Sequence, residues 1–179
     1  TFPRLLLKHA GERPRATAMR EKEFGIWQAL YWADLCTLVE HIACGLHQAG
    51  LRRDDHMVVV GSNRPRLYAT MLAVQALGAV PIPLYQDAVA AECVFPINNA
   101  DVAFAFAEDQ EQVDKLLEIR VLCPQLGHVF FDDPRGLRDY DEPGLASIDE
   151  LLAAGKAFAG QHPDFFRQQV ELAKPDDEI

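Results

Sequence analysis

The stretch "HMVVVGSNRPRLY", residues 56–68, decides the fold. Its run of valines ends at Gly61, and an apolar run bounded by turn residues is typical of a buried strand. A polar turn follows, and Pro65 favours the first turn of a helix. Strand, turn and helix together predict the start of a βα unit, whose turn holds a phosphate group in many folds.

The same pattern returns along the chain. Apolar strand candidates recur about every 22–25 residues with helix candidates between them, and this period is typical of βα units. The sequence therefore predicts an α/β fold with a largely parallel sheet and helices on both faces. The strand candidates are residues 57–61, 79–84, 102–106 and 127–131.

The first 50 residues predict elements of another kind. We expect a short helix over residues 4–9 and then a β-hairpin with the strands "RATAMRE" and "GIWQALYW". An amphipathic helix from Asp34 to about Gln48 follows, and Gly50 ends it.

Composition excludes several classes of partner. The formal net charge of −10 argues against nucleic acid, because phosphate backbones bind clustered Lys and Arg. The same charge disfavours docking on anionic lipid, although a local basic patch is left open. No signal peptide or transmembrane run is visible, and the four cysteines form no Cys-x-x-Cys pair. We therefore expect a cytoplasmic protein with reduced thiols.

An apolar helix and several prolines constrain the packing. The helix expected over residues 65–77 is apolar on almost every side, which is typical of a helix buried in something larger. Pro81 and Pro83 remove two N–H groups from one side of a strand, so this strand should lie at an edge or at a bend. Pro96 should end or kink the helix that starts near Ala88.

The residues by themselves predict no catalytic, cofactor-binding or metal-binding site. The loop 61–65 has one glycine, and it lacks both the Walker pattern and the spaced glycines of a dinucleotide turn. Asn63 is instead predicted to cap the helix that Pro65 starts. The six histidines have no metal-ligand spacing, and Ser62 and Ser147 lack the context of a nucleophile elbow.

Acidic runs are predicted to be loops, helix starts and solvated surface. Acid–base catalysis in "EDQEQVD", "DYDEP" or "DDEI" is a minor alternative. In the first of these runs, Asp109 can cap a helix and Gln112 can answer it, as in a capping box. Val113, Leu116 and Leu117 would then face the sheet.

The string "EDQEQVDKLLEI", residues 108–119, resembles a segment of long-chain fatty acyl-CoA synthetases, in the adenylate-forming superfamily. Further segments of that family resemble "GIWQALYWADL", "GLHQAGLRRDDHMVVVGSNRPRLY", "ALGAVPIPLYQD" and "VFFDDPRGLRDYDEP", in this order. The resemblance covers nearly all of residues 1–179. It implies the N-terminal part of an adenylate-forming enzyme fold, and therefore an incomplete domain.

Three positions depart from the family. Tyr31 stands where a Thr would usually cap the next helix together with Asp34, and the vacant cap should cost about 1 kcal/mol. Asp54 stands where Gly is usual, and Pro96 is also unusual.

The resemblance also implies what residues 1–179 lack. The family's phosphate loop lies just after a segment like "AKPDDEI", residues 173–179, so this chain would be the N-terminal portion of the AMP-binding domain, truncated before that loop. For the whole enzyme it implies ATP, CoA and Mg²⁺, and activation of a long-chain fatty acid to an acyl-adenylate and then an acyl-CoA thioester. The portion alone should be inactive and hold none of these cofactors.

Partners follow from the same reasoning. The rest of its own chain should cover the portion, and exposed apolar surface should otherwise favour self-association. Peripheral contact with a membrane is left open. Two alternatives remain, namely a complete non-enzymatic α/β binding module and a nucleotide-binding domain of another class.

Overall fold

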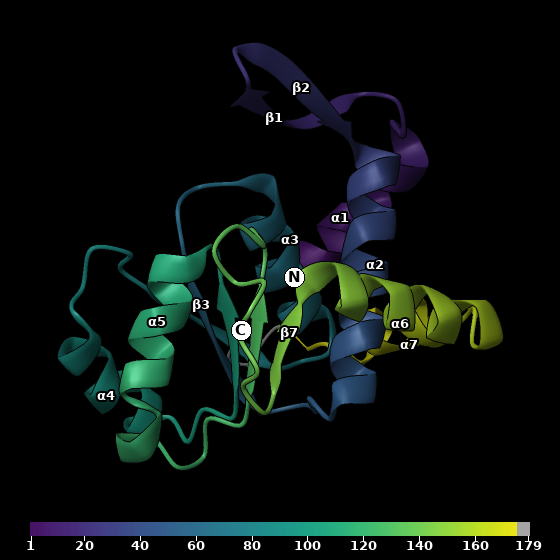
Figure 1. Ribbon diagram of the computed structural model, residues 1–179. Helices are drawn as coiled ribbons and strands as arrows, with labels where there is room; N and C mark the ends of the chain where they lie inside the picture. Colours follow the sequence, from purple (N-terminus) through teal and green to yellow (C-terminus); the bar gives the residue numbers. More distant parts are fainter. Residues whose placement is uncertain (175–179) are drawn as a thin grey trace.

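The computed structural model describes residues 1–174 and contains a five-stranded sheet between two layers of helices (Figure 1). Every neighbouring pair in this sheet is parallel, which confirms the predicted α/β fold. A separate two-stranded hairpin projects from the body. Across the sheet, the strands are β4 (Val80–Leu84), β3 (His56–Val60), β5 (Phe104–Ala107), β6 (His128–Phe131) and β7 (Leu145–Ser147).

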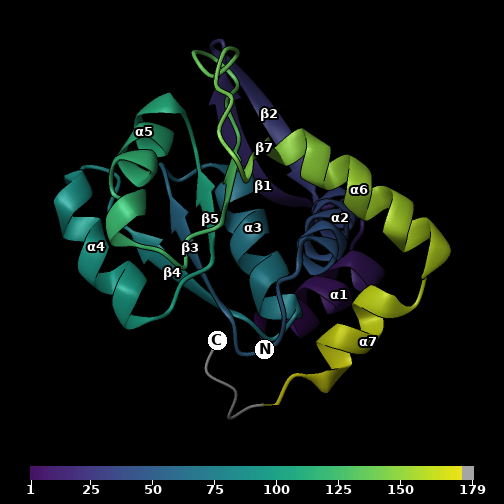
Figure 2. The same ribbon diagram turned by 60° about the horizontal axis from the view of Figure 1, so that its bottom comes forward.

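The helices cover opposite faces of the sheet, as Figures 1 and 2 show. Because side chains alternate along a strand, Val58 and Val60 of β3 face one core cluster, while Met57 and Val59 face the other. The first cluster lies under α4 (Ala90–Asn99) and α5 (Gln110–Glu118), followed by a 3₁₀ turn at Arg120–Leu122. The second lies under α1 (Phe2–Glu12), α2 (Trp32–Ala49), α3 (Pro65–Ala76), α6 (Ile148–Gln161) and α7 (Phe165–Leu172).

Strand β4 forms one edge of the sheet, as its prolines predict. The Val80 N–H donates to Asp55 O over 2.8 Å, so this N–H points towards β3. Pro81 and Pro83 lie opposite Met57 and Val59 in the register, and their nitrogens point to the other side. The two missing N–H donors therefore face away from β3, on the side where no strand of the sheet pairs with β4.

Several predicted boundaries differ from the structure. Helix α1 is longer than residues 4–9, and the three-residue strand β7 was not predicted at all. Pro96 does not end α4, which continues to Asn99. Helix α2 ends at Gly50 as expected. Residues 175–179, which include most of "AKPDDEI" and all of "DDEI", lie outside the described residues.

Most of helix α3 is covered by other elements of the same chain. Its buried residues include Leu67, Ala73 and Val74, and it packs on α1, α2 and α7 as well as on the sheet. The small alanine side chains allow these helices to approach closely. The predicted burial is confirmed for these residues, and other helices of the same chain supply it.

Asp54 adopts a left-handed backbone with φ of 67°. This finding explains why the resembled family usually has Gly at the position, since Gly reaches positive φ without steric cost. Asp is one of the few other residues that tolerate this region. The Asp54 N–H donates to Gly78 O over 3.0 Å, so the turn keeps its place beside the end of α3.

The hairpin consists of β1 (Thr17–Glu23) and β2 (Ile26–Tyr31). Its two central turn residues, Phe24 and Gly25, both have positive φ, of 48° and 80°. Type I′ hairpin turns have this property. The hairpin confirms the prediction made from the strands "RATAMRE" and "GIWQALYW".

Helices α2 and α6 meet at two glycines. A Cβ atom added to Gly155 would lie 1.8 Å from His41 O and 2.7 Å from Gly45 N. One added to Gly45 would lie 2.4 Å from Leu151 O. The two backbones therefore approach so closely that no side chain fits between them.

Gly155→Ala should lower the free energy of unfolding by roughly 2–4 kcal/mol, because the two helices must move apart. Gly160→Ala is the matched control in the same helix, since a Cβ there meets nothing within 4 Å. This control should be neutral or stabilising by roughly 0.5–1 kcal/mol. Urea unfolding of both variants checks the prediction, and equal stabilities would contradict it.

The first turn of α2 has no side-chain cap. Tyr31 is the N-cap residue and its side chain makes no capping hydrogen bond, as predicted. Trp32 N–H and Ala33 N–H donate to Ala16 O and Pro14 O, each over 3.1 Å. The N–H of Asp34, at the third helical position, is the usual partner of a capping hydroxyl.

Tyr31→Thr should therefore raise the free energy of unfolding by roughly 0.5–2 kcal/mol, because the Thr hydroxyl can accept from the Asp34 N–H. Tyr31→Val is the control, since Val has the shape of Thr but no acceptor. Thermal unfolding of both variants measures the effect. A Val variant as stable as the Thr variant would refute the vacant cap.

Candidate functional site at the carboxyl edge of the sheet

The strand order places a topological switch point between β3 and β5. From β3 the chain crosses to β4 on one side, and from β4 it returns to β5 on the other side of β3. In open parallel sheets, ligands bind outside the carboxyl ends of strands at such a point. Here Gly61 and Ser62 follow β3, and Glu108 follows β5.

The Glu108 carboxylate lies in the turn between β3 and α3. It accepts hydrogen bonds from the Ser62 N–H and, over 2.8 Å, from the Ser62 hydroxyl. Arg64 Nε lies 2.7 Å from Glu108 Oε1. The Glu108 side chain is only 14% exposed, whereas that of Arg64 is 55% exposed. The turn thus binds an anion, but this anion belongs to the chain itself.

Gly61 is required by the same contact. A Cβ atom at Gly61 would lie 2.6 Å from the Cβ of Glu108 and 2.9 Å from its Oε2. The glycine therefore permits the close approach of the Glu108 side chain.

The prediction that Asn63 caps α3 is wrong. Arg64 is the N-cap residue, because Pro65 takes the first helical position. The Asn63 side chain accepts instead from the Tyr68 hydroxyl over 2.9 Å. The predicted cap of α5 is correct, since Asp109 accepts from the Gln112 N–H over 3.2 Å. Val113 and Leu116 are buried there, as expected.

A second ion cluster joins α3 to the far side of the sheet. Arg66 Nη1 lies 2.9 Å from Asp132 Oδ1, after β6, and 2.9 Å from Asp149 Oδ1, in α6. Burial raises the pKa of Asp132 above its ordinary value, and it outweighs the opposite effect of Arg66. Burial lowers the pKa of Arg66, but the two carboxylates raise it more. The cluster therefore holds α3 and α6 at one edge of the sheet.

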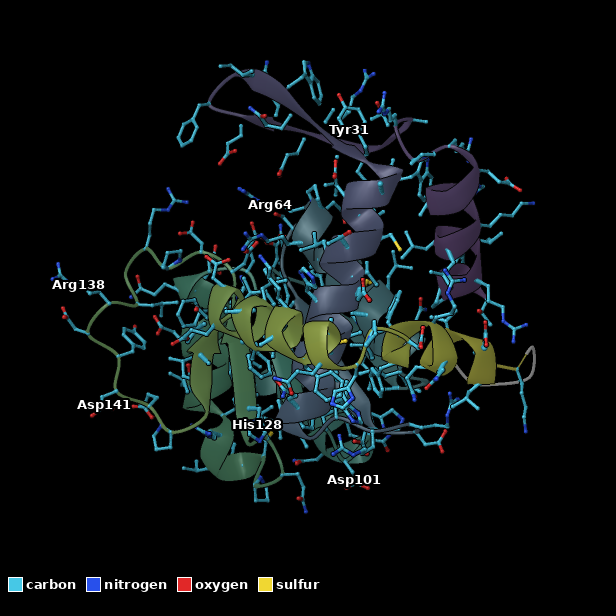
Figure 3. The ribbon with its side chains drawn as sticks, turned by 90° about the vertical axis from the view of Figure 1, so that its right-hand side faces the viewer. Tyr31, Arg64, Asp101, His128, Arg138 and Asp141 are labelled. Carbon is cyan, nitrogen blue, oxygen red and sulfur yellow. The ribbon has the colours of Figure 1, made fainter. Side chains whose placement is uncertain are left out.

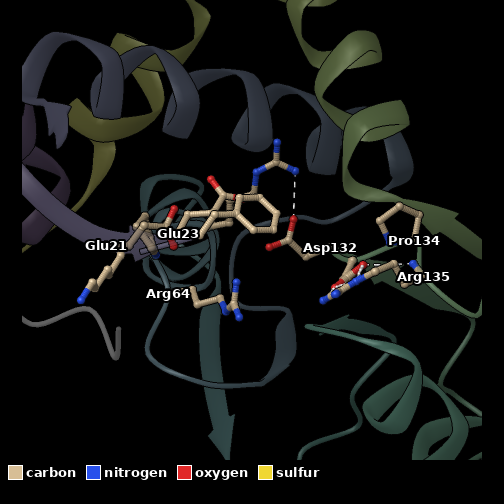
Figure 4. Close-up of a pocket in the computed structure, with 11 residues that line it drawn as sticks. Glu21, Glu23, Arg64, Asp132, Pro134 and Arg135 are labelled. Atoms are coloured by element: carbon tan, nitrogen blue, oxygen red, sulfur yellow. Dashed lines mark hydrogen bonds and ion pairs between the residues drawn. The ribbon is translucent and has the colours of Figure 1, made fainter. Parts of the chain in front are cut away.

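A cleft of about 610 Å³ opens beside these residues, between the hairpin and the loops after β3 and β6. Figure 4 shows Glu21 and Glu23 of the hairpin on one side of it, and Asp132 and Arg135 on the other. Figure 3 places Arg64 at the edge near the hairpin and His128 at the opposite edge of the sheet. The cleft thus belongs to the carboxyl edge.

The three arginines that line this cleft each pair with an acid of the same chain, and Lys22 of the hairpin lines it as well. Arg64 pairs with Glu108, Arg66 with Asp132, and Arg135 with Asp133. Within residues 1–174, no cluster of His, Cys, Asp and Glu is suited to a metal ion. A nucleoside triphosphate needs a cradle of N–H donors, usually with a Lys and a metal ion.

Ser147 and the cysteines also have structural surroundings. The Ser147 hydroxyl caps α6, where it accepts from the Glu150 N–H over 3.2 Å. The described cysteines are all free thiols. Burial raises the pKa of Cys44 to about 12 and also raises that of Cys93, so these thiols stay protonated at neutral pH.

Sequence reasoning missed the two ion clusters. The available signal was an acidic residue directly after a strand, as Glu108 follows β5 and Asp132 follows β6. Charged residues at the carboxyl ends of parallel strands meet at one edge. The sequence could have indicated that edge, but not which cation pairs with which acid.

Glu108→Ala should lower the free energy of unfolding by roughly 2–4 kcal/mol, because the Ser62 N–H and Arg64 lose a shielded charged partner. Glu111→Ala is the control, since Glu111 is 69% exposed and pairs only with Lys115 across one turn of α5. The control should lose roughly 0.5 kcal/mol or less. Urea unfolding tests both, and similar losses would contradict a central role for Glu108.

Comparison with known proteins finds one matching family model and several similar ligases. Residues 6–177 match the family model described as AMP-binding enzyme. The long-chain-fatty-acid–CoA ligase FadD15 of Mycobacterium bovis is 24% identical over 164 residues, which are 89% of this chain and 27% of the ligase. The indoleacetate–CoA ligase of Aromatoleum aromaticum is 36% identical over 77 residues, which are 43% of this chain and 14% of that protein.

Solved structures agree on the fold. The acetoacetyl-CoA synthetase of Streptomyces lividans superposes with a TM-score of 0.76 at 24% identity, over 85% of this chain and 25% of the synthetase. The chain thus spans about a quarter of the length of these proteins. The matched range and the shared parallel sheet with its hairpin lead to one conclusion: the chain belongs to the AMP-binding enzyme family and has the fold of the N-terminal part of adenylate-forming enzymes.

Proposed function

We propose that this chain is the N-terminal portion of an AMP-forming acyl-CoA ligase that activates a long-chain fatty acid. The observation that carries the proposal is the similarity to a long-chain-fatty-acid–CoA ligase along 89% of the chain. The segment 108–119 supports the same substrate class by its resemblance to long-chain synthetases.

The proposed reaction has two steps. The fatty acid carboxylate attacks the α-phosphate of ATP, which gives an acyl-adenylate and releases pyrophosphate. The thiol of CoA then attacks the acyl carbonyl, releases AMP and gives the thioester. Mg²⁺ would supply charge compensation for the phosphates in the first step.

Residues 1–174 contribute the scaffold in this proposal, and none of them is assigned to either chemical step. The Glu108 carboxylate already engages the turn after β3, where a phosphate would bind in many α/β folds. We place the triphosphate cradle, and with it the ATP and Mg²⁺ contacts, in downstream sequence. The absent downstream part is also the proposed partner of this portion.

A second substrate class has its own observation. The indoleacetate–CoA ligase and a feruloyl-CoA synthase of Amycolatopsis are each 36% identical, over 77 and 78 residues. Their names point to aryl carboxylates. This higher identity covers less than half of the chain, so the long-chain fatty acid remains the proposed substrate.

ATP affinity tests the proposal that residues 1–174 form a scaffold and that downstream residues bind the nucleotide. Residues 1–179 should not bind ATP with micromolar affinity in calorimetry, with or without Mg²⁺, because the described residues offer no triphosphate cradle. Micromolar binding would overturn the scaffold role. If this binding were lost on Ser62→Ala but kept in Thr70→Ala, loop 61–65 would be the site and a nucleotide-binding module would be the better description.

Pyrophosphate exchange tests the activity. The chain extended to the end of its reading frame should exchange labelled pyrophosphate into ATP when it is given a long-chain fatty acid. Exchange with ferulate or indoleacetate alone would keep the family and overturn the substrate. A reading frame that ends at Ile179, or an extended chain that activates no carboxylate, would contradict the ligase proposal and favour a non-enzymatic module.

A further inference from the structure

The C-terminal end of helix α7 is bound by a side chain of helix α1. Arg4 donates from Nη2 to Glu171 O over 2.9 Å and to Ala173 O over 2.7 Å. Its Nε donates to Val170 O over a longer 3.5 Å. Arg4 thus lies 166 to 169 positions before its partners in the sequence, and α1 and α7 are in contact (Figure 2).

These carbonyls belong to the end of a helix, where the last four C=O groups have no intrahelical partner. Many helices end with a left-handed glycine that helps to satisfy them. Helix α7 ends instead at Ala173, whose backbone is extended, with φ of −64° and ψ of 132°. A cation also suits the negative end of the helix dipole. Arg4 therefore supplies from α1 the cap that the sequence at the end of α7 does not provide.

The same contact sets the direction in which the chain leaves α7. Glu171 lies within the helix and Ala173 lies one residue past it, yet both carbonyls accept from one nitrogen of Arg4. A guanidinium holds several acceptors in one arrangement, because it is planar and its N–H groups form a rigid fork. Since Lys174 is the last described residue, Arg4 fixes the backbone immediately before the sequence that continues from this portion.

The rest of α7 is held by packing within the chain. Phe165, its first residue, lies with its ring centroid 4.5 Å from that of His47 in α2 and 5.1 Å from that of Phe158 in α6. Phe166 and Val170 are buried in the core cluster that α1, α2 and α3 share. In residues 1–174 no helix, α7 included, is long and apolar enough to cross a membrane. Apolar contacts thus locate the body of α7, while Arg4 locates its last carbonyls.

We propose that Arg4 is a positioning residue for nucleotide binding, because it fixes the point from which the downstream sequence continues. The inference rests on the proposed function, in which that downstream sequence holds the triphosphate of ATP. Arg4 acts through backbone carbonyls of residues 170–173 and is given no contact with substrate. The expected effect is substantial, since a misplacement of about 1 Å far from the chemistry can cost roughly a hundredfold in rate.

Hydrogen exchange of residues 1–179 tests the contact itself. In Arg4→Ala, the amides of residues 170–173 should exchange roughly tenfold faster, because the end of α7 loses its charged donor and frays. The amides of α2 and β3 should keep their protection, which would show that the fold persists. Lys8→Ala is the matched control, since Lys8 is an exposed cation one turn further along α1 and its loss changes the net charge equally. This control should leave the amides of α7 unchanged.

Pyrophosphate exchange by the extended chain tests the consequence. With a long-chain fatty acid, Arg4→Ala should raise the KM for ATP roughly tenfold and change the KM for the fatty acid less than about twofold. Arg4→Lys keeps the charge but not the fork, so its KM for ATP should lie between those of the parent and Arg4→Ala. Lys8→Ala should match the parent. A purely structural role predicts otherwise, because a smaller folded fraction lowers the maximal rate and leaves both KM values unchanged.

The outcomes separate this inference from the proposed function. A parent chain that exchanges no pyrophosphate would overturn the proposed function and the positioning role with it. An active parent whose KM for ATP is unchanged in Arg4→Ala would overturn the positioning role alone. Equal hydrogen exchange of α7 in Arg4→Ala and Lys8→Ala would also overturn it, because the end of the helix would then not depend on Arg4.

Discussion

The contact of Glu108 with the turn after β3 is the interaction on which the carboxyl edge depends. The backbone of Glu108 donates to Val60 O over 3.0 Å and accepts from the Asp133 N–H over 2.7 Å, so this one residue joins the ends of β3, β5 and β6. Its carboxylate then fixes Ser62 and Arg64, the residues that lead into α3. A charge shielded from water needs such partners, so this contact couples the ends of the strands to the turn.

Much of the fold could be predicted from local patterns. The strands of the central sheet are short apolar runs between turn residues. The prolines of β4 indicated an edge strand, because each proline lacks the N–H that would donate to a neighbouring strand on that side. Strand β7 escaped prediction because three residues carry no periodic signal. Helix α3 shows the limit of this reasoning. The apolar pattern of a helix predicts that it is buried, but it does not identify the elements that bury it. Its alanines accept α2 and α1 from the same chain.

The polar edge could be predicted only in part. Acids directly after β5 and β6 are visible in the sequence, but their partners are distant. The Ser62 hydroxyl and Glu108 lie 46 positions apart, and Arg66 and Asp132 lie 66 apart. No local rule links such pairs, because topology brings them together. The error at Asn63 has a local cause, since a proline at the first helical position fixes the cap one residue before it.

The proline edge of β4 has a consequence during synthesis. A partly folded sheet that has emerged from the ribosome exposes unpaired strands. Strands of neighbouring nascent chains can pair with them before folding is complete. Pro81 and Pro83 turn their missing donors to that open side, so an invading strand would find two of its carbonyls without partners. The prolines therefore oppose intermolecular β-pairing at this edge as soon as residues 80–84 pair with β3.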